Sequence, residues 1–244
     1  MKALILAGGR GKRINNQEGS SNKCLLPCMG KPLIQYSLEN AVEAGVESIV
    51  IVVGYRAEDI INKFGTTFLG LKILYVIQDE RKGLVHAMVC AREMINGSDF
   101  MLFLGDEVIV SSHHDKMLQF FRNEKLFVAC GTVRVKDLSQ ITKTYALIED
   151  EKTKNIFRLI EKPRIPINNI MGTGNCVMRS DIFNYIERTP INNERNEKEL
   201  PDLIQCAIDE GRIIKHFNIG DGYFNINTPE DIVLAEKYIK QIKK

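Results

Sequence analysis

The residues with the clearest chemical potential follow the first apolar segment of the chain. Residues 6–13 read Leu-Ala-Gly-Gly-Arg-Gly-Lys-Arg. Glycines let the backbone turn sharply and bring its N–H groups against an anion, and the three basic residues add positive charge. We therefore expect a loop that binds a polyphosphate rather than an ordinary tight turn. The candidate nucleotide-binding positions in it are Leu6, Ala7, Gly8, Gly9 and Gly11.

Two better-known glycine loops do not fit this segment. The Walker pattern requires Ser or Thr after Gly-Lys, and here Arg13 follows Gly11-Lys12. The dinucleotide fingerprint requires a third glycine where Ile14 stands, and an acidic residue about 20 positions on. The sequence thus supports neither a P-loop ATPase nor a dehydrogenase.

A second chemical group follows another apolar run. Gly105-Asp106 comes directly after Phe100–Leu104, and parallel sheets place ligands at the carboxyl ends of their strands. Mg²⁺ prefers a carboxylate together with phosphate oxygens and water. Asp106 is therefore the first candidate metal ligand, and Mg²⁺ the expected cofactor.

The histidines and the closest cysteine pair predict no further metal site. His113 and His114 are adjacent, so their side chains diverge at the start of a helix, and with His86 they are expected to be structural or surface residues. Cys24 and Cys28 lack a second paired motif, which argues against structural zinc. Reduced thiols are expected.

Alternating strands and helices position these groups in the first half of the chain. The apolar strands are nearly continuous hydrophobic runs, as in parallel sheets covered on both faces by crossover helices. The pattern predicts a doubly wound α/β fold. The expected order is strand Lys2–Ala7, helix Pro32–Ala44, strand Ser48–Val53, helix Glu58–Phe64, strand Lys72–Ile77, helix Gly83–Ile95 and strand Phe100–Leu104.

The pattern in the second half of the sequence predicts more strands with fewer helices between them. The mostly parallel sheet is therefore expected to become mixed. Expected strands are Val128–Val135, Tyr145–Glu149, Asn155–Glu161 and Gly174–Met178; expected helices are Ser180–Glu187, Glu199–Asp209 and Pro229–Ile242.

Size and composition are those of one ordinary globular domain. The 244 residues are 44% hydrophobic and 26% charged, with a net charge of +2. We expect a single domain over residues 1–244, with a nucleotide-binding half of about 1–110 and an acceptor-binding half of about 111–244. The small net charge argues against nucleic acid or an anionic membrane as partner. No signal peptide or spanning segment is evident, which predicts a cytoplasmic protein.

The combination of these motifs resembles the sugar-phosphate nucleotidyltransferase family. Its hallmarks are Leu-Ala-Gly-Gly-x-Gly-x-Arg, a Lys-x-Leu-Leu-Pro stretch, here Lys23–Pro27, and a Gly-Lys-Pro, here Gly30–Pro32. The resemblance covers nearly the whole chain and implies a Rossmann-like nucleotidyltransferase fold. It implies that Arg13 and Lys23 hold the triphosphate and stabilise charge in the reaction. Lys12 replaces the family's usual Thr, and Asn22 its usual Pro.

The same resemblance assigns the base reader and the second metal ligand. Gln78, followed five residues later by Gly83, matches the pair that reads a pyrimidine base, and an amide can both donate and accept, as uracil or thymine requires. Asn227 matches the position that helps the aspartate hold the metal, where Asp is commoner.

The resemblance also implies an acceptor site. Its residues are Tyr145, Glu161, Lys162, Thr173 and Gly174. In the family's Glu-Lys-Pro the carboxylate bonds sugar hydroxyls and the ammonium holds the sugar phosphate, which suits the chemistry of both groups. Ala146 stands where a glycine is usual, so we expect its methyl group near the acceptor.

The expected reaction joins a nucleoside triphosphate, dTTP or UTP in preference, to a sugar 1-phosphate with release of pyrophosphate. Lys162, Arg13 and Lys23 are the expected catalytic residues, and a homodimer is a family-based expectation. Two alternatives stay open: a cytidylyltransferase acting on a sugar phosphate or other phosphorylated alcohol, suggested by Ala146, and a non-catalytic nucleotide-sugar-binding regulatory protein. A metal-dependent glycosyltransferase fits less well, because Gly105–Glu107 lacks Asp-x-Asp.

Overall fold

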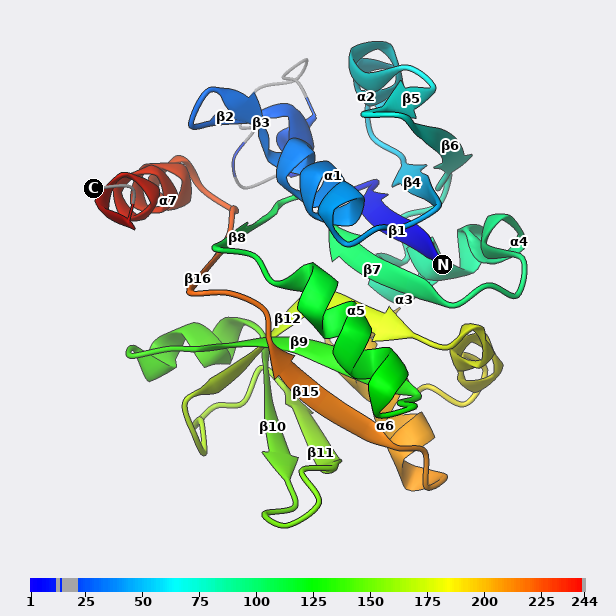
Figure 1. The fold of residues 1–244 in the computed structure, drawn as a ribbon, viewed down its shortest axis with the longest axis vertical. Helices are drawn as coiled ribbons and strands as arrows, with labels where there is room; N and C mark the ends of the chain where they lie inside the picture. The colour runs from blue at the N-terminus through cyan, green and yellow to red at the C-terminus, as the bar shows by residue number, and fades with distance from the viewer. Residues whose placement is uncertain (12–13, 15–21, 243–244) are drawn as a thin grey trace.

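The computed structural model describes residues 1–11, 14 and 22–242, which form a mixed ten-stranded sheet covered by helices (Figure 1). The main strands are β1 (Lys2–Ala7), β4 (Ser48–Val53), β6 (Leu71–Ile77), β7 (Phe100–Leu104), β9 (Val128–Arg134), β10 (Tyr145–Glu149), β11 (Ile156–Glu161), β12 (Ile170–Met178) and β15 (Ile214–Asn218). The helices are α1 (Leu33–Glu43), α2 (Ala57–Phe64), α3 (Gly83–Cys90), α4 (Arg92–Ile95), α5 (His114–Asn123), α6 (Leu200–Asp209) and α7 (Pro229–Ile242). Shorter elements are β2 (Pro27–Cys28), β3 (Lys31–Pro32), β5 (Thr67–Phe68), β8 (Glu107–Val110), β13 (Ile191–Asn192), β14 (Glu197–Lys198), β16 (Gly222–Asn225), and the 3-10 turns η1 (Lys23–Leu25), η2 (Leu138–Lys143) and η3 (Ser180–Tyr185).

Four parallel strands form the centre of the sheet. Strand β1 lies between β7 and β4, and β6 extends the sheet beyond β4. Because the strands are parallel, their carboxyl ends meet at one edge, and the loops after β1, β6 and β7 begin there. This edge carries the glycine-rich segment, Gln78 and Asp106.

Successive side chains of the central strands enter two different hydrophobic clusters. Leu4 and Val50 pack with residues of α3 and α6, whereas Ile5 and Ile51 pack with residues of α1 and α5. In Figure 1, α1 and α5 cover the face turned to the viewer. Both faces of these strands are therefore buried, which explains their continuous hydrophobic runs.

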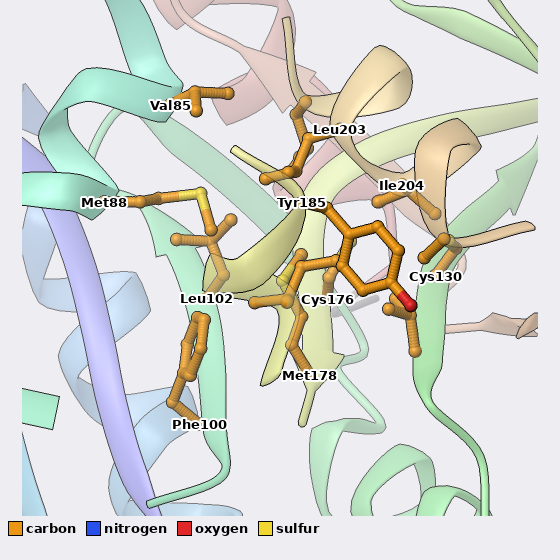
Figure 2. Packing of buried hydrophobic residues seen from close by; sticks show 14 of the residues in the cluster. Val85, Met88, Phe100, Leu102, Cys130, Cys176, Met178, Tyr185, Leu203 and Ile204 are labelled. Carbon is orange, nitrogen blue, oxygen red and sulfur yellow. The ribbon is translucent and has the colours of Figure 1, made fainter. Parts of the chain in front are cut away.

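The cluster beneath α3 and α6 joins the two halves of the chain. Figure 2 shows Met88 of α3 and Leu102 of β7 beside Met178 of β12 and Leu203 of α6. The two halves of the chain therefore share this core.

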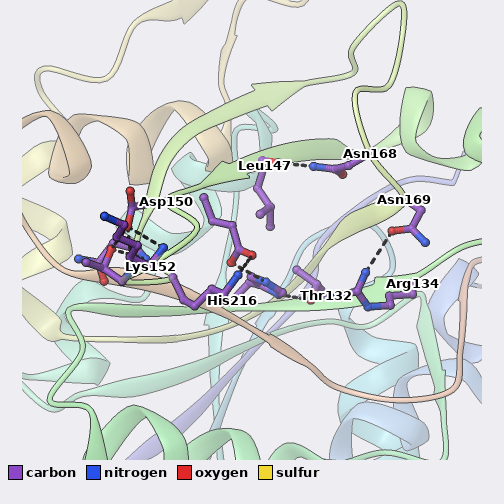
Figure 3. A network of polar contacts seen from close by, with 12 residues as sticks. Thr132, Arg134, Leu147, Asp150, Lys152, Asn168, Asn169 and His216 are labelled. Carbon is purple, nitrogen blue, oxygen red and sulfur yellow. Dashed lines mark hydrogen bonds and ion pairs between the residues drawn. The ribbon is translucent and has the colours of Figure 1, made fainter.

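The second half curls its part of the sheet so that β15 approaches β11. Strand β12 pairs antiparallel with β7, β9 and β10, and β15 runs parallel to β9. Polar contacts link the strands of this region: His216 of β15 lies 3.0 Å from the Thr132 hydroxyl and 3.1 Å from a Glu149 carboxylate oxygen, and Arg134 donates to Asn169 (Figure 3). The contact between His216 and Glu149 joins β15 to β10, which are not paired with each other.

The expected fold class is confirmed, including the mixed character of the sheet. Strands Lys2–Ala7, Ser48–Val53, Phe100–Leu104 and Tyr145–Glu149 have the predicted bounds. The single helix expected over Gly83–Ile95 was wrong in detail, because it breaks at Ala91 into α3 and α4. Helix α5 was expected only at its start, at the histidine pair, and strand β15 and the β8–β16 pair were not predicted. No helix in the described part of the chain is long and apolar enough to cross a membrane.

Candidate functional site

The glycine-rich loop follows β1 and is exposed at Gly9 and Arg10. The N–H groups of Gly9, Arg10 and Gly11 donate to no backbone oxygen of the described residues. Leu6 and Ala7 end the strand, and the Leu6 carbonyl accepts from Gly105 N at 2.9 Å. Consecutive N–H groups on an exposed glycine loop suit phosphate oxygens. Arg13 and Lys12 lie outside the described residues.

Lys23 is a buried lysine held at the start of a short 3-10 turn. The Asn22 side chain begins this turn by accepting from Cys24 N at 2.9 Å, and its amide donates to the Tyr55 carbonyl at 2.7 Å. Lys23 is only 7% exposed. The Asn22 departure from the family pattern therefore has a structural reason: it ties the lysine's turn to the loop after β4.

Three of the predicted residues meet at one point. Lys23 Nζ lies 2.5 Å from Asp106 Oδ2 and 3.1 Å from Asn227 Oδ1. A Cβ added to Gly11 would lie 2.7 Å from the Cβ of Lys23, so the glycine loop passes directly over the lysine stem. The loop, the lysine and the two oxygen ligands thus form one site, although they come from four distant parts of the sequence.

The β8–β16 pair brings Asn227 to Asp106. Asn225 lies opposite Glu107 in this antiparallel pair, and Ile226 N donates to the Asp106 carbonyl at 3.0 Å. The Asn225 side-chain carbonyl accepts from Asn227 Nδ2 at 2.9 Å, which leaves the Asn227 oxygen directed at Lys23. The Asp231 carboxylate accepts from Asn227 N at 2.8 Å at the start of α7. Asn227 is thus held on both sides.

The donor set fits a magnesium ion. The Asp106 carboxylate and the Asn227 carbonyl oxygen already share one cation, the Lys23 ammonium, so both oxygens point to a common centre. One carboxylate with one neutral oxygen leaves room for phosphate oxygens and water, which Mg²⁺ prefers over an all-protein cage.

Gln78 follows β6 directly and packs against the glycine loop. It is 6% exposed, and its Oε1 would lie 2.7 Å from a Cβ added to Gly8. Gly83, which begins α3 with φ of +88°, accepts from Gln78 Nε2 at 3.2 Å through its carbonyl. A Cβ on Gly83 would lie 2.6 Å from the Glu197 carboxylate, so only glycine fits there.

Glu161 ends β11 and Lys162 follows it. The Lys162 side chain is 40% exposed, and its Nζ lies 3.4 Å from Glu161 Oε1. Arg195, which was not predicted, lies on the loop between β13 and β14 with Nη1 3.3 Å from Glu161 Oε1 and 2.6 Å from Glu199 Oε1. Two cations therefore flank the Glu161 carboxylate, an arrangement that suits an anionic, hydroxylated molecule.

Tyr145 and Thr173, two further predicted acceptor residues, have buried side chains. Tyr145 is 4% exposed, and a Cβ on Gly172 would lie 2.1 Å from its ring. The Thr173 hydroxyl donates to the Gly131 carbonyl at 3.0 Å. Ala146 is fully buried, and its methyl group belongs to the same core cluster as Met171.

A buried polar network lies behind Asp106. The Glu107 carboxylate accepts from the Tyr223 hydroxyl at 2.6 Å, from Asn175 Nδ2 at 2.7 Å and from Gly174 N at 3.2 Å. Burial raises the pKa of Glu107 to about 8, although the Tyr223 and Gly174 hydrogen bonds oppose the shift. Gly174 is thereby fastened to β8, the strand that follows Asp106.

His114 extends this network without facing the site. Its Nε2 lies 3.0 Å from Asn175 Oδ1 and its Nδ1 lies 2.7 Å from the Ser112 hydroxyl, and it is 1% exposed. Burial lowers the pKa of His114 to about 4. A neutral, structural histidine follows.

Replacement of His114 by Gln is expected to make the free energy of unfolding less dependent on pH in the acid range. His114 takes up a proton near pH 6.5 in the unfolded chain but only near pH 4 in the folded chain. Its contribution to the free energy of unfolding is therefore fully present above pH 6.5 and falls by about 3 kcal/mol as the pH drops toward 4. Urea unfolding at pH 7, 5.5 and 4.5 measures this slope. His113→Gln, the neighbouring histidine, is the matched control and should keep the wild-type slope; equal slopes in all three proteins would contradict the assignment.

The residues missed by sequence reasoning are Arg195, Glu107, Tyr223 and Asn225. Asn225 stands two residues before Asn227, and Glu107 directly follows Asp106, so proximity in sequence was the available signal for both. No spacing links Arg195 or Tyr223 to the site, because each reaches it through a strand pairing that only the fold defines.

Comparison with protein families gives one match over nearly the whole chain. The family model described as "Nucleotidyl transferase" matches residues 2–241. A UTP–glucose-1-phosphate uridylyltransferase of Haloferax volcanii is 30% identical, over 99% of this chain and 97% of that protein. A glucose-1-phosphate thymidylyltransferase of Streptomyces griseus is 31% identical, over 98% of this chain and 66% of that protein.

Solved structures share the fold. A UDP-glucose pyrophosphorylase in complex with UDP-glucose superposes with a TM-score of 0.87 at 23% identity, over 99% of this chain and 98% of that chain. An inositol-1-phosphate CTP transferase from T. maritima superposes with a TM-score of 0.77 at 24% identity, over 100% of this chain and 96% of that one. At these identities the likeness concerns the architecture alone.

Proposed function

Because this chain belongs to the nucleotidyl transferase family, we propose that it transfers a nucleoside monophosphate from UTP or dTTP to a sugar 1-phosphate, with release of pyrophosphate. The observation that carries the proposal is the meeting of Lys23, Asp106 and Asn227 beneath the glycine loop. The two relatives above, which act on glucose 1-phosphate by name, support the acceptor class.

The residues of the site have separate roles in an in-line displacement. The acceptor's phosphate oxygen attacks the α-phosphorus opposite the departing pyrophosphate, and no side-chain nucleophile is required because a phosphate monoester is already anionic near neutral pH. The N–H groups of the glycine loop and the Lys23 ammonium bind phosphate oxygens. Arg13 is proposed to act with them. Positioning and electrostatic stabilisation supply most of the acceleration.

Asp106 and Asn227 are proposed to hold Mg²⁺. When bound, the ion supplies positive charge that offsets the charge growing on the phosphate oxygens. The Asn225 and Asp231 contacts keep the Asn227 oxygen in place for this role.

Lys162 and Glu161 are proposed to bind the acceptor. The ammonium binds its phosphate and the carboxylate accepts from its hydroxyls. Tyr145, Thr173 and Gly174 support the wall on which the sugar ring rests. Because the Ala146 methyl group lies in the core, it no longer favours a different phosphorylated alcohol.

A panel assay of pyrophosphate release tests the proposal. It crosses dTTP, UTP, CTP, GTP and ATP with several hexose 1-phosphates and phosphorylated polyols, with Mg²⁺ or with EDTA. Turnover with UTP or dTTP and one hexose 1-phosphate is expected, and its loss in EDTA. Turnover only with CTP would identify a cytidylyltransferase, and silence throughout would favour a nucleotide-sugar sensor. Light scattering on the same sample tests the expected homodimer. Fractionation of source cells tests the proposed cytoplasmic location.

Gly8→Ala is expected to raise the KM for UTP roughly tenfold, because its Cβ, 2.7 Å from Gln78 Oε1, displaces the proposed base reader and weakens a hydrogen bond. Initial rates against UTP concentration measure the effect. Gly9→Ala is the comparison, since its Cβ meets nothing within 4 Å. Gly9→Ala should keep the wild-type preference among the nucleoside triphosphates. The same loss of that preference in Gly8→Ala and Gly9→Ala would contradict the role of Gln78.

A further inference from the structure

The amide of Gln78 is held in one orientation by its surroundings. Its NH₂ group lies 3.2 Å from the Gly83 carbonyl oxygen and 3.1 Å from His86 Nδ1. A carbonyl oxygen can only accept, so the atom beside it must be the nitrogen, whichever way the amide is drawn. The Gln78 oxygen therefore lies on the other side, against Gly8.

That oxygen can accept a hydrogen bond from a ligand. Gln78 is only 6% exposed, and no hydrogen bond among the described residues ends on its Oε1, yet Oε1 is not one of their fully buried, unpaired oxygens. The atom therefore keeps access to a ligand, which can supply the donor. It faces the first glycine of the loop proposed to hold the triphosphate.

His86 is the second constraint on this amide. It lies on α3, one turn into the helix that Gly83 begins. Because the Gln78 NH₂ donates to Nδ1, the ring must carry its proton on Nε2. The same Nδ1 is 3.9 Å from the Cys90 sulfur, a much weaker contact. Turning the amide over would place its oxygen against the Gly83 carbonyl, so that two acceptors would face each other, and would require the ring to carry its proton on Nδ1 instead.

We propose that His86 is a positioning residue for nucleobase selection: it holds the Gln78 carbonyl oxygen toward the base and so favours uracil or thymine over cytosine. This inference rests on the proposed function. Uracil and thymine carry a hydrogen on ring N3, which Gln78 Oε1 can accept, whereas N3 of cytosine is itself an acceptor. A site built to pair one pattern rejects the other because its polar groups are left unpaired. His86 acts through Gln78 and contacts no substrate.

The test compares UTP and CTP binding to the full chain by calorimetry, without acceptor, in wild type, His86→Ala, His86→Asn and Cys90→Ala. The Asn side-chain oxygen stands where Nδ1 stood and can accept from Gln78. We expect the ratio of the CTP and UTP dissociation constants to fall roughly three- to tenfold in His86→Ala, as loss of one hydrogen bond predicts. It should stay within about twofold of wild type in His86→Asn and Cys90→Ala.

Each outcome separates this inference from the proposed function. A wild-type preference for UTP that persists in folded His86→Ala would overturn the role of His86 while leaving the function intact. A fall in both His86 variants would also overturn it, because a general disturbance of α3 would then explain the change. A wild type that binds neither nucleotide would overturn both. Thermal unfolding of each variant confirms that the proteins compared are folded.

Discussion

Asp106→Asn is expected to lower kcat by about two to three orders of magnitude while the fold survives. The substitution keeps the shape of the side chain but removes the negative charge that faces Lys23 at 2.5 Å and that is proposed to hold Mg²⁺. Two neutral oxygens, on residues 106 and 227, would remain, and hard divalent cations bind such pairs weakly. Initial rates at increasing Mg²⁺ concentration measure the loss and show whether excess metal recovers part of it.

Asp99→Asn is the matched control for this variant. Asp99 precedes the same strand, β7, and also faces a cation, with Arg179 Nη1 at 3.3 Å. It lies at the opposite end of the strand from the site, so kcat should stay near wild type. Equal rates for wild type and Asp106→Asn, at Mg²⁺ near its dissociation constant, would remove Asp106 from the metal site.

The placement of Asp106 and Gln78 could be predicted because it depends on one general property of parallel sheets. Each residue comes directly after a buried strand, and the carboxyl ends of β1, β6 and β7 lie at the same edge. The hydrophobic runs identify those strands without knowledge of their order. The nucleotide side of the site was therefore accessible from sequence together with the family motifs.

The orientation of Ala146 could not be predicted in this way. Strand β10 was predicted with the observed bounds, yet the side to which residue 146 points depends on the pairing with β11 and β12. A shift of one residue in that register would exchange the faces of Tyr145 and Ala146. The sequence predicts the strand, but its pairing within the sheet determines which side chains face the proposed acceptor site.

The extent of helix α5 beyond the histidine pair could have been predicted from its sequence. Met117, Leu118 and Phe121 recur at helical spacing and are all buried, which is a common amphipathic pattern. Arg195, by contrast, is placed by a two-residue hairpin with no periodicity to detect.

Lys162→Met is expected to lower kcat/KM for the sugar 1-phosphate by about two to three orders of magnitude while UTP binding is kept. The variant retains most of the aliphatic stem and removes the ammonium proposed to bind the acceptor's phosphate. Lys162 has φ of +43°, and its N–H donates to the Thr144 carbonyl at 2.6 Å. Initial rates at varied acceptor concentration and calorimetry with UTP separate the two effects.

Lys154→Met provides a close structural match for that variant. Lys154 also has a positive φ, of +61°, is exposed, and lies 3.2 Å from a carboxylate, that of Glu149. It belongs to the β10–β11 turn and has no proposed contact with substrate, so its removal should leave kcat/KM within about twofold of wild type. Because the two lysines share backbone conformation, exposure and an acidic neighbour, a large loss confined to Lys162 would assign the effect to its place beside Glu161 and Arg195. Equal losses in both would instead point to a general dependence on surface charge and contradict the acceptor site.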